Sequence, residues 1–142
     1  MMVFADTSAL FALLARNDRM HPAARATFEH LAKHDARLVT SSYVLVETIA
    51  LLQRRIGLTA VGDFHAKIVP LLEIIWVDNG WHSRAIYRLL MSGARDLSLV
   101  DCLSFEIIEA KALPHAFAFD KHFQAEGIPT VAPDVPAGPS HA

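Results

Sequence analysis

Cysteine, charge and long hydrophobic runs are all scarce in this sequence of 142 residues. Cys102 is the single cysteine, which excludes an internal disulfide framework and is typical of a reducing cytosol. No apolar run approaches the roughly 18 residues of a membrane-spanning helix, and the apolar N-terminus lacks the basic residues of a secretion signal. Lys and Arg number 13 and Asp and Glu number 15, so the net charge of −2 indicates no particular partner. We therefore expect a cytoplasmic protein without a membrane segment.

Hydrophobic residues are abundant instead and make up 53% of the chain. This content excludes a disordered protein, because there is enough apolar surface to offset the entropy that the chain loses on folding. It also indicates apolar surface left over for a partner. The length predicts one domain, over residues 1–132. Residues 133–142 are rich in Pro, Gly and Ser, which predicts a flexible C-terminal tail.

Short apolar segments alternate with segments of helical periodicity along the chain. The apolar segments show no polar alternation, which is typical of parallel strands that helices cover on both faces. A helix over residues 58–73 is expected to bend or end at Pro70. The sequence thus predicts an α/β fold with its functional site beyond the carboxyl ends of the strands. The predicted strands are 3–5, 38–40, 74–77, 116–119 and a short one near 129–131.

Four acidic residues lie in apolar surroundings, where a solvated protein surface does not explain them. They are Asp6, Glu47, Asp101 and Asp120. Asp6 and Asp120 fall at the ends of predicted strands, and the other two fall in the first turns of predicted helices. We therefore expect the four to converge on one pocket. Clustered carboxylates repel one another and cannot all ionise without a cation.

The divalent ions Mg²⁺ and Mn²⁺ fit such a site best, because they are hard cations that prefer oxygen ligands. A site without His or Cys ligands is poor for zinc. One or two such metals can activate water and stabilise a leaving oxygen. The four acids therefore favour phosphoryl transfer or phosphodiester cleavage.

Each acid also has a structural interpretation that needs no metal. Asp6 can cap the helix that follows it, and Asp101 can form a capping box with Ser98. Glu47 can lie on a solvated helix face, and Asp120 can start a turn. All four acids together, in this order, favour the metal site.

For three other residues a structural role is a simpler interpretation than a functional one. His122 can lie near the mouth of the pocket, although packing at the surface is the simpler interpretation. Cys102 is expected to face the core as a small hydrophobic residue. Trp76 is expected in the core rather than as a platform on which bases stack.

Four motifs carry a resemblance to a known family. They are DTSAL at 6–10, VLVET at 44–48, DLSLVDCLSF at 96–105 and FAFDKHF at 117–123. In this order, over residues 2–131, they resemble a PIN-domain nuclease and most closely the VapC-type toxins of bacterial toxin–antitoxin pairs. The resemblance implies a three-layer α/β/α fold with a parallel sheet of strand order 3-2-1-4-5. It also implies an Mg²⁺-dependent endoribonuclease (Mn²⁺ being an alternative) that cleaves RNA, forms a homodimer and binds a small antitoxin.

The resemblance also assigns roles to individual residues. The family's catalytic acids, which bind the metal, fall on Asp6, Glu47, Asp101 and Asp120. The small polar residues that line the pocket fall on Thr7, Ser8 and Ser98, and a further acid falls on Asp96. Asp6 and Asp101 would bind the principal metal, and the other two ligands would complete the site.

Two alternative functions stay open at this point. A PIN-domain nuclease of RNA processing would have no antitoxin, so an antitoxin gene immediately upstream would favour the toxin. A non-catalytic α/β binding module would be favoured if site acids were missing, and all four are present.

Overall fold

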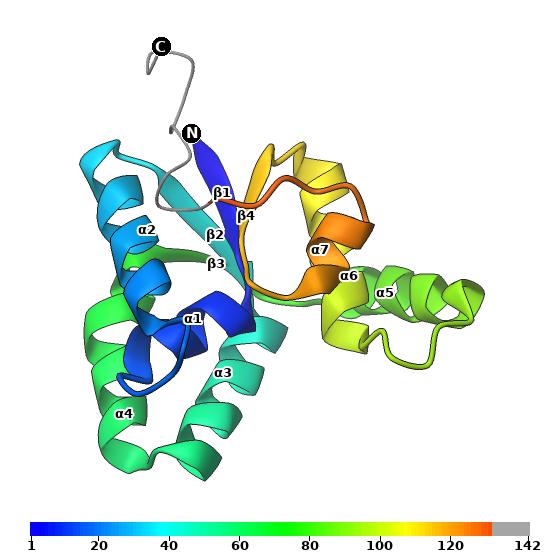
Figure 1. Ribbon diagram of the computed structural model, residues 1–142. Helices are drawn as coiled ribbons and strands as arrows, with labels where there is room; N and C mark the ends of the chain where they lie inside the picture. Colours follow the sequence, from blue (N-terminus) through cyan, green and yellow to red (C-terminus); the bar gives the residue numbers. More distant parts are fainter. Residues whose placement is uncertain (132–142) are drawn as a thin grey trace.

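The computed structural model describes residues 1–131. Its centre is a sheet of four parallel strands in the order β3-β2-β1-β4. Helices lie on both sides of this sheet (Figure 1). The predicted α/β class and the order of the first four strands are confirmed. The strands are β1 (Met2–Ala5), β2 (Arg37–Ser41), β3 (Leu72–Ile75) and β4 (His115–Phe117).

The helices form two groups on either side of the sheet. Helix α1 packs on α2 and α3, and α3 packs on α4, while α5 packs along α6 on the other side (Figure 1). The central strand β1 is buried on both faces, with Val3, Phe4 and Ala5 fully covered, as parallel strands in this architecture are. The helices are α1 (Thr7–Leu14), α2 (His21–Lys33), α3 (Ser42–Arg55), α4 (Leu58–Asp63), α5 (Asn79–Ser92), α6 (Leu99–Lys111) and α7 (Lys121–Ala125).

One aromatic side chain holds the short helix α7 in place. Phe123 is fully buried, and its ring lies 6.5 Å from that of Phe4 on β1 and 5.2 Å from that of Phe105 on α6. Such aromatic pairs add to the stability that burial alone provides. The start of α7 is therefore fixed relative to both β1 and α6.

Arg88 links the helices on the same side of the sheet. From α5 its guanidinium makes ion pairs of 2.8–3.1 Å with three glutamates, and it lies over the ring of Phe105. The glutamates are Glu106 and Glu109 on α6 and Glu126 just after α7. This network holds α5, α6 and the end of α7 together.

The fifth strand of the predicted order 3-2-1-4-5 is absent from the described residues. Thr130 makes one isolated parallel bridge to Ala116 of β4. Ala116 N–H donates to the carbonyl of Pro129 at 2.9 Å, and Val131 N–H donates to the carbonyl of Ala116 at 2.9 Å. Pro129 has no N–H of its own to extend this pairing. The contact therefore stays a single bridge and does not become a strand.

The predicted helix over residues 58–73 is also shorter than expected. Helix α4 ends at Asp63 and continues as a π-helical turn, Phe64–Ile68, and a 3₁₀ turn, Val69–Leu71, that contains Pro70. The succession of helical turns ends just after Pro70, and the next strand begins at Leu72, two residues before the predicted start.

No helix within residues 1–131 is long and apolar enough to cross a membrane. The predicted tail, residues 133–142, lies outside the described residues.

Candidate metal centre at the carboxyl edge of the sheet

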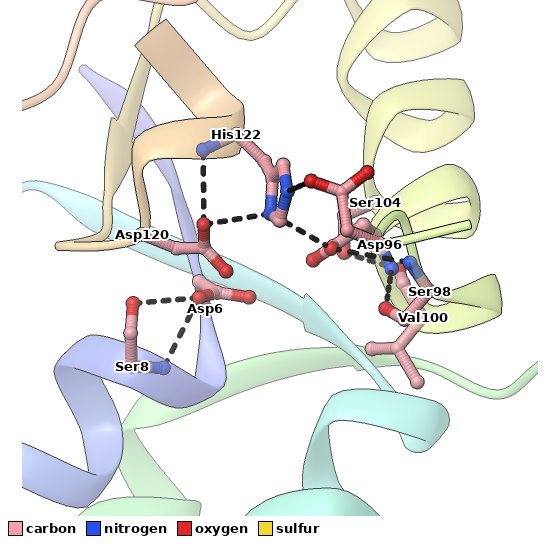
Figure 2. Close-up of polar contacts among 9 residues, drawn as sticks. Asp6, Ser8, Asp96, Ser98, Val100, Ser104, Asp120 and His122 are labelled. Carbon is pink, nitrogen blue, oxygen red and sulfur yellow. Dashed lines mark hydrogen bonds and ion pairs between the residues drawn. The ribbon is translucent and has the colours of Figure 1, made fainter. Parts of the chain in front are cut away.

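Asp6 follows β1 directly and lies at the carboxyl edge of the sheet. Its backbone N–H donates to the carbonyl of Phe117 on β4 at 3.0 Å. Its side chain caps α1, because Oδ2 accepts hydrogen bonds from Ser8 N–H at 3.1 Å and from Ser8 Oγ at 2.7 Å. Ser8 Oγ in turn accepts a hydrogen bond from Phe119 N–H at 2.9 Å. Figure 2 shows the hydrogen bonds from Ser8 to the Asp6 carboxylate. Through Phe119 N–H, Ser8 also joins this carboxylate to the segment that leaves β4.

The Asp6 carboxylate is almost completely buried, with 3% of the residue exposed. Burial raises its pKa from 3.8 to about 6, and the hydrogen bonds from Ser8 oppose this rise. The negative charges of Asp101 and Glu47 raise the pKa further. These three predicted ligands therefore lie close enough to interact electrostatically. Negative charge at Asp6 is unfavourable in the protein alone, and a cation at this edge would stabilise it.

Asp101 lies in the first turn of α6 and takes part in a capping box. Ser98 Oγ accepts a hydrogen bond from Asp101 N–H at 3.0 Å, and Asp101 Oδ2 accepts one from Ser98 N–H at 3.5 Å. The second bond is long, so the carboxylate contributes little as a cap. Burial and the nearby charge of Asp120 raise the pKa of Asp101, against the opposing effects of Ser98 and His122.

Asp120 and His122 meet Asp101 at the start of α7. Asp120 caps this helix by accepting a hydrogen bond from His122 N–H at 2.9 Å. The imidazole Nδ1 of His122 lies 2.8 Å from Asp120 Oδ1 and 3.5 Å from Asp101 Oδ2. Ligand atoms of Asp101, Asp120 and His122 all lie within 4.8 Å of one another.

Of the two positions expected for His122, the structure shows the one near the site: its ring lies among the acids, and 21% of its side chain is exposed. His122 is the second residue of α7, after the Asp120 cap, and its ring lies beside that carboxylate. The spacing of Asp120 and His122 in FAFDKHF was the signal for this arrangement.

The remaining predicted residues surround this group. Glu47, half-buried on α3, adds negative charge near Asp6 but is not in the 4.8 Å group. Thr7 is buried, and its hydroxyl accepts a hydrogen bond from the Thr48 hydroxyl at 3.3 Å, which joins α1 to α3. Asp96 is exposed, and its hydrogen bond with His122 Nε2 at 3.4 Å lowers the pKa of Asp96 and raises that of His122.

The donor set fits a divalent cation. Carboxylate oxygens predominate, two of the acids have raised pKa values, and the buried Nδ1 atom of His122 has no hydrogen-bond partner within residues 1–131. Two of the four acids, Asp6 and Asp120, are also helix caps, so the structural and the metal interpretations do not exclude each other. The caps hold the carboxylates at the sheet edge, where a metal can meet them.

A parallel α/β sheet with acids at the carboxyl ends of β1 and β4 and at the start of α6 is the arrangement of a PIN domain. The family model for the PIN domain matches residues 3–127, and the chain belongs to this family. Its curated relatives include the 23S rRNA-specific endonuclease VapC20 of Mycobacterium tuberculosis, which is 32% identical over 134 residues. That match covers 94% of this chain and 100% of the relative.

Solved structures agree with this assignment. The crystal structure of Mycobacterium tuberculosis VapC20, described as a toxin that cleaves the sarcin–ricin loop, superposes with a TM-score of 0.81 at 30% identity. It covers 92% of this chain and 99% of VapC20. VapBC2 of Rickettsia felis, solved with a DNA fragment of its promoter, has the same fold at 16% identity, with a TM-score of 0.67 over 92% of this chain and 98% of that one. The resemblance to VapC-type proteins is confirmed.

Proposed function

We propose that this protein is a metal-dependent endoribonuclease and the toxin of a toxin–antitoxin pair. The observation that carries the proposal is the convergence of Asp101, Asp120 and His122 within 4.8 Å, beside the buried Asp6. A bound Mg²⁺ or Mn²⁺ would supply positive charge opposite the scissile phosphate and make a water more acidic. The protein's own part is to hold the acids at fixed positions before the RNA arrives.

The proposed roles follow from burial and contacts. Asp6 and Asp101 bind the metal directly, because both are buried and both have a raised pKa that a cation would lower. Asp120 completes the site from the start of α7, and Glu47 faces Asp6 as the less buried acid that orients water or a second metal. Ser8 positions the Asp6 carboxylate, and the Ser98 hydroxyl caps α6 by accepting the backbone N–H of Asp101.

The proposed substrate is RNA, and the first sequence to test is the sarcin–ricin loop of 23S rRNA. The support is the activity of VapC20, a 23S rRNA-specific endonuclease that cleaves the sarcin–ricin loop and that this chain matches over its full length at 32% identity. Because ribosomal RNA lies in the cytoplasm, this substrate would place the activity there.

A small antitoxin and a second copy of the chain are the proposed protein partners. Large hydrophobic side chains are exposed on α3, α5 and the segment after β3, and a partner would remove them from water. Trp76 is one of them: it was expected in the core, but it follows the edge strand β3 and is 70% exposed. The others include Val46, Tyr87, Leu90 and Met91. A homodimer predicts twice the monomer mass in light scattering at micromolar concentrations, and a monomer at high micromolar concentration would contradict it.

The central experiment is cleavage of a sarcin–ricin loop RNA by the purified chain, with a scrambled RNA of equal length beside it. We expect cleavage of the loop in Mg²⁺ or Mn²⁺ and none in EDTA. The Asp101→Asn variant should fold and bind less metal, and its rate should fall by several orders of magnitude. Cleavage that persists in EDTA, or an Asp101→Asn variant as active as the wild type, would refute the mechanism.

A further inference from the structure

The two ring nitrogens of His122 have different surroundings. Nε2 donates to the carboxylate of Asp96 at 3.4 Å. Nδ1 is buried and has no hydrogen-bond partner within residues 1–131, although it lies 2.8 Å from Asp120 Oδ1 and 3.5 Å from Asp101 Oδ2. Figure 2 shows the ring between the carboxylates of Asp120 and Asp96. Nδ1 therefore approaches two acids at close range without the geometry of a hydrogen bond to either.

The position of this ring is set by its neighbours in the chain. His122 N–H is held by the Asp120 carboxylate, and the next residue, Phe123, is locked between Phe4 and Phe105. These contacts fix the backbone at His122, so the side chain starts beside the acids. The ring itself contacts Asp120, Asp101 and Asp96.

We propose that His122 Nδ1 is a nitrogen ligand of the metal that Asp101 and Asp120 hold, with Asp96 accepting the Nε2 proton. This inference rests on the proposed function. Neighbouring ligand atoms of an octahedral ion with bonds of about 2.1 Å are about 3 Å apart. The Nδ1 contacts of 2.8 and 3.5 Å bracket that spacing, and ligands of one ion point at the ion and not at each other. Histidine ligands also donate their second N–H to a carboxylate in most metal sites, which is the arrangement with Asp96.

A nitrogen ligand changes which metal the site prefers. Mg²⁺ is bound almost entirely by oxygen, whereas imidazole suits the first-row transition metals. The set of Asp101, Asp120 and His122 should therefore bind Mn²⁺ more tightly than Mg²⁺. A site of carboxylates alone would discriminate less between the two ions.

The test uses the full chain, metal-free and without a histidine tag, to which less than one equivalent of Mn²⁺ is added. Pulsed electron paramagnetic resonance of the bound Mn²⁺ should show modulation from a directly bound ¹⁴N nucleus. The His122→Gln variant should lose this modulation, because Gln can still reach Asp96 but has no atom at the place of Nδ1. We expect its Mn²⁺ affinity to fall at least tenfold and its Mg²⁺ affinity to fall less.

The matched control is His34→Gln, at the residue that follows α2. His34 and His30 are four residues apart with ring centroids at 4.4 Å, so they are a pair of histidines away from the acids that could hold Mn²⁺. This variant should keep both the nitrogen signal and the Mn²⁺ affinity. Loss of the signal in His34→Gln would overturn the proposal, and so would its survival in His122→Gln.

Absence of a nitrogen signal from Mn²⁺ bound to the wild type would also overturn the proposal, whatever the variants show. His122 would then be only an ion-pair partner of the acids. That result leaves the proposed function standing if the wild type still cleaves RNA in a metal-dependent way. A wild type that binds neither Mn²⁺ nor Mg²⁺ would refute both.

Discussion

Replacing Asp6 by Asn should stabilise the metal-free protein at neutral pH. Asn is as good a helix cap as Asp, and its side-chain oxygen can still accept the hydrogen bonds of Ser8. The substitution therefore removes the charge while it keeps the cap. The substitution also relieves the repulsion between the negative charge of Asp6 and those of Asp101 and Glu47.

The magnitude and its sign follow from the two pKa values of Asp6. The carboxyl ionises near 3.8 in the unfolded chain and at about 6 in the native protein. Between these values the unfolded state loses its proton first, so this group makes the protein less stable as pH rises, until the native carboxyl is also ionised. A difference of about two pKa units corresponds to about 3 kcal/mol. We expect Asp6→Asn to exceed the wild type by up to about 3 kcal/mol at pH 8 and to match it near pH 4.

The assay is urea unfolding in EDTA from pH 4 to pH 8, followed by circular dichroism. Asp6→Ala is the matched control: it loses the cap as well as the charge, and should be about 0.5–2 kcal/mol less stable than Asp6→Asn at every pH. Added Mn²⁺ should stabilise the wild type more than either variant. The rise in the free energy of unfolding reports metal binding to the native state, and both variants lack the Asp6 carboxylate. A stability difference that does not change with pH, or an Asp6→Asn variant that is less stable at pH 8, would refute the reasoning.

Three further substitutions test neighbouring contacts. Ser8→Ala should reduce stability by about 1–2 kcal/mol, since it removes hydrogen bonds to Asp6 and Phe119, and should raise the pKa of Asp6 in a titration followed by NMR. Ser98→Ala removes the hydroxyl that caps α6 and should reduce the free energy of unfolding in urea by about 0.5–2 kcal/mol. Added Mn²⁺ should stabilise this variant as much as the wild type, because Asp101 still binds the metal. Arg88→Met should reduce the free energy of unfolding by about 2 kcal/mol. This is less than the loss expected for a fully buried ion pair, because the glutamate partners are partly exposed. High salt should reduce the stability difference between this variant and the wild type.

Strand ends and isolated acids could be predicted from the sequence for a physical reason. Apolar runs without alternation predict buried parallel strands, and an acid that ends such a run has to lie at the carboxyl edge of the sheet. That argument placed Asp6 and Asp120 correctly. Asp101 followed from its place in the first turn of an apolar helix. Their mutual contacts depend on where α6 and α7 pack, and the sequence alone does not contain that information.

The features that were missed depend on tertiary context. Pairing of a fifth strand depends on how many N–H groups can bond to the edge of β4, and Pro129 removes one of them. Trp76 lies beyond the end of the edge strand, where no helix in residues 1–131 buries it, although its residue type predicted the core. The contacts of His122 with Asp96 and Asp101 could not be predicted, because these acids come from another segment of the chain.

The coincidence of helix caps and metal ligands explains how the site forms before any metal binds. A cap needs a carboxylate oxygen directed at the first amides of a helix, and β1–α1 and β4–α7 both place such a cap at the same edge of the sheet. The capping hydrogen bonds go to Oδ2 of Asp6 and to Oδ1 of Asp120, so the other oxygen of each carboxylate keeps lone pairs for a metal. Burial of these charges, together with the repulsion between them, makes the metal-free site less stable, as the raised pKa values of Asp6 and Asp101 indicate. The same repulsion is what a divalent cation removes, so preorganisation by the caps and affinity for the metal have one structural origin.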